Sequence, residues 1–224
     1  MTLIIDCLVD NGILIGADCK KTDDKNNFIG KTQKIFPFQS KDKISFIYTA
    51  SGLLCIDQQE TCKMFSTNLR LSNVTSCLKQ LAFDNLKSFT NNNFLFNSSD
   101  GCGLMLYYFD KNIPFQSQFL FNYKSKYQKK VTNKLLHGFI GSNLVGKNSE
   151  RFYQLISENL QYFQLLKYSF LTKEPISYKN GQEIVQWTLE NYIHHYPDQL
   201  TGSGIQLGIL KPAEFEWIRK DFEK

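Results

Sequence analysis

Residues 2–18 read TLIIDCLVDNGILIGAD, and this stretch decides the fold that we expect. Residues 3–9 are mostly apolar, Asp10-Asn11-Gly12 is a tight-turn sequence, and residues 13–18 are again mostly apolar. An Asn-Gly pair between two apolar runs is a strong signal for a β-hairpin. The stretch therefore predicts two antiparallel strands, and the second should be buried on both faces because it is nearly all apolar.

Beyond this hairpin the hydrophobic pattern predicts groups of strands that alternate with pairs of helices. We expect short strands at 28–30, 33–38 and 43–50, two amphipathic helices between 53 and 89, strands at 103–109, 115–121 and 135–141, helices at 144–168 and 179–195, and a last strand at 204–210. This order predicts an α+β fold, a four-layer αββα sandwich with two mostly antiparallel sheets between helix layers. The 224 residues contain no long linker, so we expect one domain over residues 1–224.

Composition excludes several classes of function. The net charge of +5 comes from dispersed lysines, so nucleic-acid binding is not expected. The apolar runs are far shorter than a bilayer span, and the N-terminus lacks the features of a secretory signal, so we expect a cytoplasmic protein without membrane contact. The six cysteines have no metal-ligand spacing with the three histidines. We therefore expect reduced thiols, no metal and no cofactor.

Thr2 carries the chemistry that the sequence suggests. If Met1 is removed, one residue presents both a hydroxyl and an α-amine, and an amine with a pKa near ~7.7–8.0 can take the hydroxyl proton near neutral pH. A lysine cation held by a carboxylate would favour the unprotonated amine by lowering its pKa. Lys34 and Asp18 lie downstream and are of these chemical types.

Read together, several segments resemble the family of proteasome β-subunits and bacterial HslV, which are N-terminal threonine peptidases. The segments are Thr2-Leu3-Ile4-Ile5, Asn11 to Asp18, Gly30-Lys31-Thr32-Gln33-Lys34-Ile35, Tyr48-Thr49-Ala50-Ser51-Gly52, Phe139-Ile140-Gly141-Ser142, and Asp198-Gln199-Leu200-Thr201-Gly202. Ser51 and Asn143 stand where the family usually has glycine, and Thr201 stands where it has serine. The resemblance implies the N-terminal nucleophile hydrolase fold.

The resemblance also implies a role for each matching residue. Thr2 would be the nucleophile, with Lys34 tuning the amine, Asp18 anchoring Lys34 and the Ser51 N–H stabilising the oxyanion. Ser142, Asp198 and Thr201 would orient the N-terminal residue. The pocket for the substrate residue before the cut would be lined by Lys21, Thr32, Thr49 and Leu53. By the same resemblance we expect a homo-oligomeric ring that encloses a chamber for peptide or protein substrates. No phosphate-binding loop occurs in the chain, so any unfolding energy would come from a separate ATPase.

Each of these residues also has a purely structural explanation. A threonine after the initiator methionine is common, Asp18 suits a strand end, and Lys34 suits a surface. Ser142 suits a helix cap and Asp198 a turn. Three functions therefore stay open: a threonine peptidase, a non-catalytic ring subunit that serves assembly, and an N-terminal nucleophile amidohydrolase for a small amide.

Overall fold

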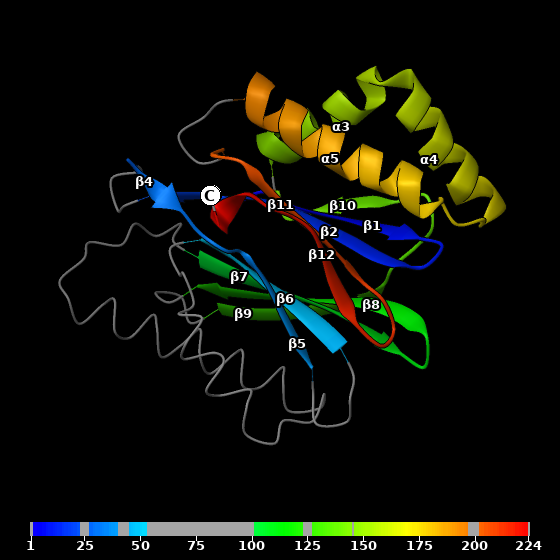
Figure 1. Ribbon diagram of the computed structural model, residues 1–224, viewed down its shortest axis with the longest axis horizontal. Helices are drawn as coiled ribbons and strands as arrows, with labels where there is room; N and C mark the ends of the chain where they lie inside the picture. The colour runs from blue at the N-terminus through cyan, green and yellow to red at the C-terminus, as the bar shows by residue number, and fades with distance from the viewer. Residues whose placement is uncertain are drawn as a thin grey trace. The chain divides into compact units, whose positions relative to one another are not determined.

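The computed structural model describes residues 2–22, 27–39, 45–52, 101–122, 127–144, 146–196 and 202–223 (Figure 1). By their contacts the residues fall into two compact units. The first unit comprises Met1–Ile35, Lys134–Lys211 and Phe215–Lys224, and the second comprises Phe36–Asn133 and Pro212–Glu214. One domain over residues 1–224 stays a prediction.

The first unit is built on a five-stranded antiparallel sheet with the order β10-β1-β2-β11-β12. Its strands are β1 (Ile4–Val9), β2 (Gly12–Asp18), β10 (Ile140–Ser142), β11 (Ile205–Leu210) and β12 (Phe215–Lys220). The predicted hairpin is confirmed, since β1 and β2 pair in antiparallel register with Ile4 opposite Ala17. Every residue of β2 is buried, as its apolar sequence predicts.

Helices α3 (Lys147–Glu158), α4 (Leu160–Thr172) and α5 (Tyr178–His195) lie on one face of this sheet (Figure 1). Glycine permits the close approach of α5 to β2, because a Cβ at Gly16 would lie 2.5 Å from Leu189 Cδ1. The core of the unit joins apolar side chains of the sheet to Phe152 of α3 and Ile184 of α5, both fully buried. One face of the sheet that carries the candidate site is thus covered by closely packed helices.

The prediction of one helix over 144–168 is wrong, because the chain forms two helices that meet at Asn159. Asn159 has an extended backbone (φ −87°, ψ 90°), and its side chain accepts a hydrogen bond from the Tyr162 N–H at 3.2 Å. An asparagine that caps a helix in this way separates two helices without a glycine or proline. The predicted helix at 179–195 is confirmed as α5, which begins after a Ser177 cap.

The second unit contains a five-stranded sheet with the order β5-β6-β7-β8-β9. Its strands are β5 (Ile35–Gln39), β6 (Ser45–Gly52), β7 (Gly101–Asp110), β8 (Ile113–Asn122) and β9 (Tyr127–Lys134). A separate two-stranded sheet joins β3 (Lys20–Thr22) to β4 (Phe28–Lys31). The two helices predicted between 53 and 89 lie outside the described residues.

Two strand predictions need correction. The strand expected at 135–141 is wrong for most of its length, because the chain turns at His137 and Gly138, where φ is +71°, and β10 begins only at Ile140. The strands β9 and β12 were not predicted, since β9 is rich in lysine and lacks an apolar alternation. The α+β class with antiparallel sheets is confirmed.

Candidate active site

Asp18 ends β2 and is the centre of the candidate site. Its side chain is fully buried, and four donors surround its carboxylate. One oxygen, Oδ1, accepts from the Leu3 N–H at 2.9 Å. The other, Oδ2, accepts from Lys34 Nζ at 2.7 Å, from the Lys20 N–H at 3.2 Å and from the Gly202 N–H at 3.3 Å. This number of donors suits an ionised carboxylate.

Asp18 and Lys34 form a buried ion pair, with 0% and 6% of their side chains exposed. Burial raises the pKa of the Asp18 carboxyl, while the Lys34 ammonium and the N–H groups of Leu3 and Lys20 oppose that rise. Removing one partner of such a pair leaves a buried charge without compensation, which is strongly destabilising. Because each buried ion needs the other, the Lys34 ammonium is held at the Asp18 carboxylate inside the first unit.

Asn143 holds the start of β1 from the other side. Its Nδ2 donates to the Thr2 carbonyl at 2.6 Å, and its Oδ1 accepts from the Ile4 N–H at 2.8 Å. Its own N–H donates to the Ile4 carbonyl at 3.2 Å, which extends the pairing of β10 with β1. Thr2 is therefore fixed through its main chain, and only 8% of it is exposed.

Gln206 connects the strand end at Asp18 to the segment that carries Lys34. Its buried side-chain amide makes four hydrogen bonds to the main chain. Oε1 accepts from the N–H groups of Lys34 at 2.8 Å and Ile35 at 3.0 Å, and Nε2 donates to the carbonyls of Asp18 and Thr32, both at 3.2 Å. The two oxygen lone pairs and both amide hydrogens are thereby used.

A glycine-rich turn closes the site next to Asp18. Gly202, Ser203 and Gly204 have φ values of +133°, +64° and +94°, a run of positive values that glycine adopts easily and serine rarely does. The turn directs the Gly202 N–H to Asp18, and the Gly204 carbonyl accepts from the Cys19 N–H at 3.0 Å. The segment after the strand end is thus shaped around the carboxylate.

The structure brings Asp18 and Lys34 together with the main chain next to Thr2, as the sequence spacing suggests. The two oxygens of one carboxylate bind Leu3 N and Lys34 Nζ, so the ammonium lies close to the main chain at Leu3. A cation so placed favours the neutral form of a neighbouring amine. Ser142 lies on β10, opposite Ile5 of β1.

The remaining predicted site residues lie away from the contacts around Asp18 or outside the described residues. Lys21 is exposed on β3, and the Thr32 N–H, just after β4, donates to the Cys19 carbonyl at 2.9 Å. Thr49 and Ser51 are on β6 in the second unit, where they pair with Met105 and Gly103. Three predicted residues, Leu53, Asp198 and Thr201, lie outside the described residues.

Sequence reasoning missed the part that Asn143 and Gln206 play. A signal was present for Gln206, because it is the single polar side chain in the strand IQLGIL. A lone amide in an otherwise buried apolar strand needs partners, and here the partners are main-chain groups of the site. Asn143 gave a weaker signal, since asparagine is common where a strand ends.

Within the ranges that the structure describes, no group of three or more His, Cys, Asp or Glu side chains is arranged to hold a metal ion. No helix in the same ranges is long and apolar enough to cross a membrane. Burial raises the pKa of the Cys19 thiol, beside Asp18, to about 11, so this thiol is protonated at neutral pH.

No protein-family profile matches the chain, and no curated protein matches its sequence. Solved structures of Anbu proteins do match its fold. A Gly-1 mutant of Anbu from Hyphomicrobium sp. strain MC1 has a TM-score of 0.61 at 9% identity, over 100% of this chain and 89% of that one. Anbu, the ancestral β-subunit, from Yersinia bercovieri has a TM-score of 0.60 at 11% identity, over 100% and 89%. The helical assembly of the Anbu complex from Pseudomonas aeruginosa has a TM-score of 0.61 at 11% identity, over 97% and 86%.

The chain therefore has the fold of Anbu proteins, one of which is described as an ancestral β-subunit. The assignment to the proteasome β-subunit and HslV family is wrong, because the matching structures are Anbu proteins. The error has a physical reason. The short motifs around Thr2, Asp18 and Lys34 follow from the way the strands are arranged, and proteins of different families can share that arrangement. At identities of 9–11% such motifs therefore indicate the fold and do not distinguish the family.

Proposed function

We propose that this chain is an N-terminal threonine hydrolase of the Anbu-like, proteasome-related type, which cleaves peptide bonds within a homo-oligomer. One observation carries the proposal. A single buried carboxylate, Asp18, binds the N–H of Leu3 and the ammonium of Lys34, next to the residue that would become the nucleophile. A solvated strand-end aspartate or a surface lysine has no need of this arrangement.

In the proposed reaction Thr2 becomes the N-terminal residue after removal of Met1. The α-amine takes the proton of Thr2 Oγ while Oγ attacks the peptide carbonyl carbon. The new C–O bond gives a tetrahedral oxyanion, for which we propose the Ser51 N–H as a donor. Collapse breaks the C–N bond, and the proton passes from the amine to the leaving nitrogen. Water then attacks the resulting ester and gives a proton to the α-amine, the C–Oγ bond breaks, and the amine passes this proton to Oγ.

Lys34 acts through charge in this proposal, and Asp18 acts through position. The ammonium favours the neutral α-amine by electrostatic repulsion of its protonated form. Asp18 keeps the ammonium in place, and its full burial limits screening by solvent. Ser142, Asp198 and Thr201 are proposed to orient the N-terminal residue, and Lys21, Thr32, Thr49 and Leu53 to line the substrate pocket.

Assembly and architecture complete the proposal. We propose the four-layer αββα arrangement and a homo-oligomer, since Anbu from Pseudomonas aeruginosa forms a helical assembly. Enclosure within an assembly would limit access of folded proteins to the nucleophile, which makes a separate ATPase a reasonable partner. A cytoplasmic location is proposed with it.

The test combines mass, labelling and turnover on the purified full chain. Intact mass and N-terminal sequencing should find Thr2 as the first residue, and an epoxyketone or β-lactone probe should modify it. Thr2→Ala should abolish labelling, and Lys34→Ala should abolish peptide turnover. Lys31→Ala is the matched control, because Lys31 is an exposed lysine on the neighbouring β4 and should retain turnover. Turnover at the wild-type rate in Lys34→Ala would contradict the proposal.

A second candidate is a non-catalytic subunit that keeps the fold for assembly. The burial of Thr2, of which 8% is exposed, favours it, because an extended substrate must reach the hydroxyl. Retention of Met1 in the purified protein, together with failure of both probes to label the chain, would decide for this candidate. The same sequencing and labelling experiment therefore separates the two functions.

A further inference from the structure

Helix α4 is apolar on its outer face as well as on its inner face. Its inner face packs on the first unit, with Leu166 and Ser169 buried and Tyr162 and Leu165 half-buried. At 100° per residue, the opposite face presents Leu160, Phe163, Gln164, Lys167, Tyr168 and Leu171, which we call the α4 stripe. Four of these six side chains are large and apolar or aromatic, whereas the solvent face of a helix is normally charged or polar.

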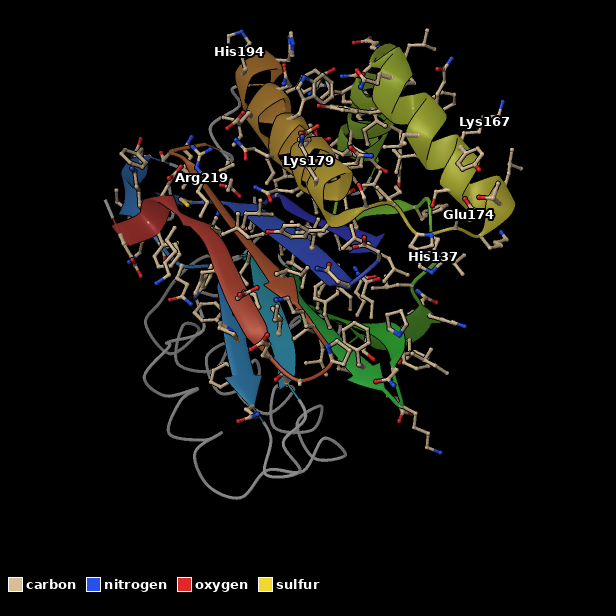
Figure 2. The ribbon with its side chains drawn as sticks, turned by 45° about the vertical axis from the view of Figure 1, so that its right-hand side comes forward. His137, Lys167, Glu174, Lys179, His194 and Arg219 are labelled. Atoms are coloured by element: carbon tan, nitrogen blue, oxygen red, sulfur yellow. The ribbon has the colours of Figure 1, made fainter. Side chains whose placement is uncertain are left out.

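All six side chains of the α4 stripe are exposed. Leu160 is 63% exposed, Phe163 42% and Leu171 67%, which is unusual for large apolar residues. Lys167 projects from the helix away from α5 (Figure 2). The stripe therefore faces outward.

Exposed apolar side chains gather around this helix. Of the 11 large hydrophobic residues that are exposed within the described ranges, seven lie on α4 or on the loop beside it: Leu136, Phe139, Leu160, Phe163, Tyr168, Phe170 and Leu171. The loop contacts the helix through Phe139 and Phe170, whose ring centroids are 6.4 Å apart. Apolar side chains gathered at one place on a surface mark an interaction site.

The order of the side chains in the stripe favours a second copy of the chain as its partner. It reads Leu-x-x-Phe-Gln-x-x-Lys-Tyr-x-x-Leu, and the reversed order again places leucine, an aromatic ring and a polar side chain at matching positions. Two copies related by a two-fold axis would place Leu160 against Leu171 of the partner subunit and Phe163 against Tyr168 of the partner subunit. A surface that matches its own reverse is suited to an isologous contact. We propose that the α4 stripe binds the α4 stripe of a second copy, antiparallel, across a two-fold axis.

Charge supports the same pairing. Lys167 would face Gln164 of the partner subunit, so the two lysines do not oppose each other at the axis. At the ends, exposed Glu158 would face Lys173 of the partner subunit. Opposite charges then lie at the two ends, the leucine and aromatic side chains lie between them, and the Lys167–Gln164 pairs lie nearest the axis. A parallel pairing would bring Lys167 against its own copy.

The inference deepens the proposed function, since it rests on the proposed homo-oligomer and names one of its contacts. A standard interface buries about 800 Å² per partner, which is more than one helix supplies. The flanking side chains of Leu136, Phe139 and Phe170 extend the contact beyond the 13 residues of α4. The contact is independent of Thr2, so the peptidase reaction and this interface can fail separately.

Cysteine cross-linking of the full chain tests the register of the contact. The double variant Leu160→Cys/Leu171→Cys should form a disulfide-linked species of twice the 26.0 kDa chain mass on a non-reducing denaturing gel, and reductant should remove it. Gln161→Cys/Thr172→Cys is the matched control, because both residues are exposed on α4 outside the stripe and have the same sequence separation. Mixed Leu160→Cys and Leu171→Cys single variants should cross-link, and neither should do so alone.

Charge substitution tests the energetics by light scattering. Leu160→Glu/Leu171→Glu places two carboxylates against each other at both ends of the contact and should weaken association at least about 100-fold. Leu160→Glu/Leu171→Lys pairs opposite charges only in the antiparallel register and should restore much of it. Unchanged circular dichroism melts would show that the variants fold.

The outcomes separate the inference from the proposed function. If the wild type assembles but the stripe cysteines link no faster than the control pair, the α4 contact is refuted and the homo-oligomer stands. If the wild type stays at 26.0 kDa at all concentrations, the proposed assembly and the α4 contact are both refuted. Labelling of Thr2 by the probe reports on the peptidase in either case.

Discussion

Replacing Gln206 by alanine tests the account of the buried amide most directly. The substitution leaves two N–H groups and two carbonyls of the main chain without their partner. An unsatisfied buried polar group costs about 1–3 kcal/mol, so the lower end of this range gives about 4 kcal/mol for four groups. A small domain has a free energy of unfolding of only about 5–15 kcal/mol. Gln206→Ala should therefore lower the free energy of unfolding of the first unit by a large fraction.

Urea denaturation followed by far-UV circular dichroism measures this loss. Gln161→Ala is the matched control, because Gln161 is an exposed glutamine on α4 and should change the free energy of unfolding by less than about 0.5 kcal/mol. A Gln206→Ala variant within about 1 kcal/mol of the wild type would refute the reasoning, since the four groups would then have found other partners.

Gln206→Glu adds a pH test with nearly the same volume. The introduced carboxyl keeps an acceptor but faces the carbonyls of Asp18 and Thr32, so the folded state favours its protonated form and raises its pKa above the unfolded value near ~4.3. A raised folded pKa contributes stability at low pH that is lost as the pH rises through it. The deficit against the wild type should therefore be larger at pH 8 than at pH 5.5, and an equal deficit would contradict the assignment of the amide hydrogens.

Three further predictions concern other parts of the first unit. Asn143→Ala removes two side-chain hydrogen bonds to the start of β1 and should cost about 1–2 kcal/mol in urea denaturation. Asn143→Asp keeps the acceptor but places a carboxylate oxygen against the Thr2 carbonyl, so it should cost at least as much at neutral pH, and a clearly smaller cost would contradict the assigned donor. Burial raises the pKa of Cys7 to about 12 and of Cys19 to about 11, so peptide mapping should find both unmodified after iodoacetamide at pH 8, and fast modification would refute their burial. Gly138→Ala should lower the melting temperature strongly, because a Cβ there would lie 2.2 Å from the Phe170 main-chain nitrogen at a φ of +71°; an unchanged melting temperature would show that the loop can move away.

The sequence predicts the local features of the hairpin well and the connections between elements poorly. Apolar runs around Asn11-Gly12 determine both strands because period and turn chemistry agree. The break at Asn159 escapes such reasoning, since a capping side chain interrupts no apolar pattern. The lysine-rich β9 escapes it as well, because its pairing depends on neighbouring strands and not on its own hydrophobicity.

The candidate site was predictable in its charges and not in its scaffold. Residue type and spacing point to Asp18 and Lys34, and the two form an ion pair of 2.7 Å. The partners that fix them are main-chain groups and the amides of Gln206 and Asn143. Those amides come from positions 188 and 141 residues away from the groups they bind, so no local pattern reveals the contacts.

The burial of Asp18 shows how the fold and the proposed chemistry can share one group. Three main-chain N–H groups around Asp18 need an acceptor, and its carboxylate accepts hydrogen bonds from all three, which belong to Leu3, Lys20 and Gly202. These three bonds lower the energy of the ionised carboxylate before any contribution from the ammonium. The Lys34 ammonium contributes most against the desolvation of Asp18, and the N–H bonds of Leu3 and Lys20, which the fold requires in any case, add to it. Lys34 is thereby held close to the main chain at Leu3, where the proposed reaction needs a positive charge.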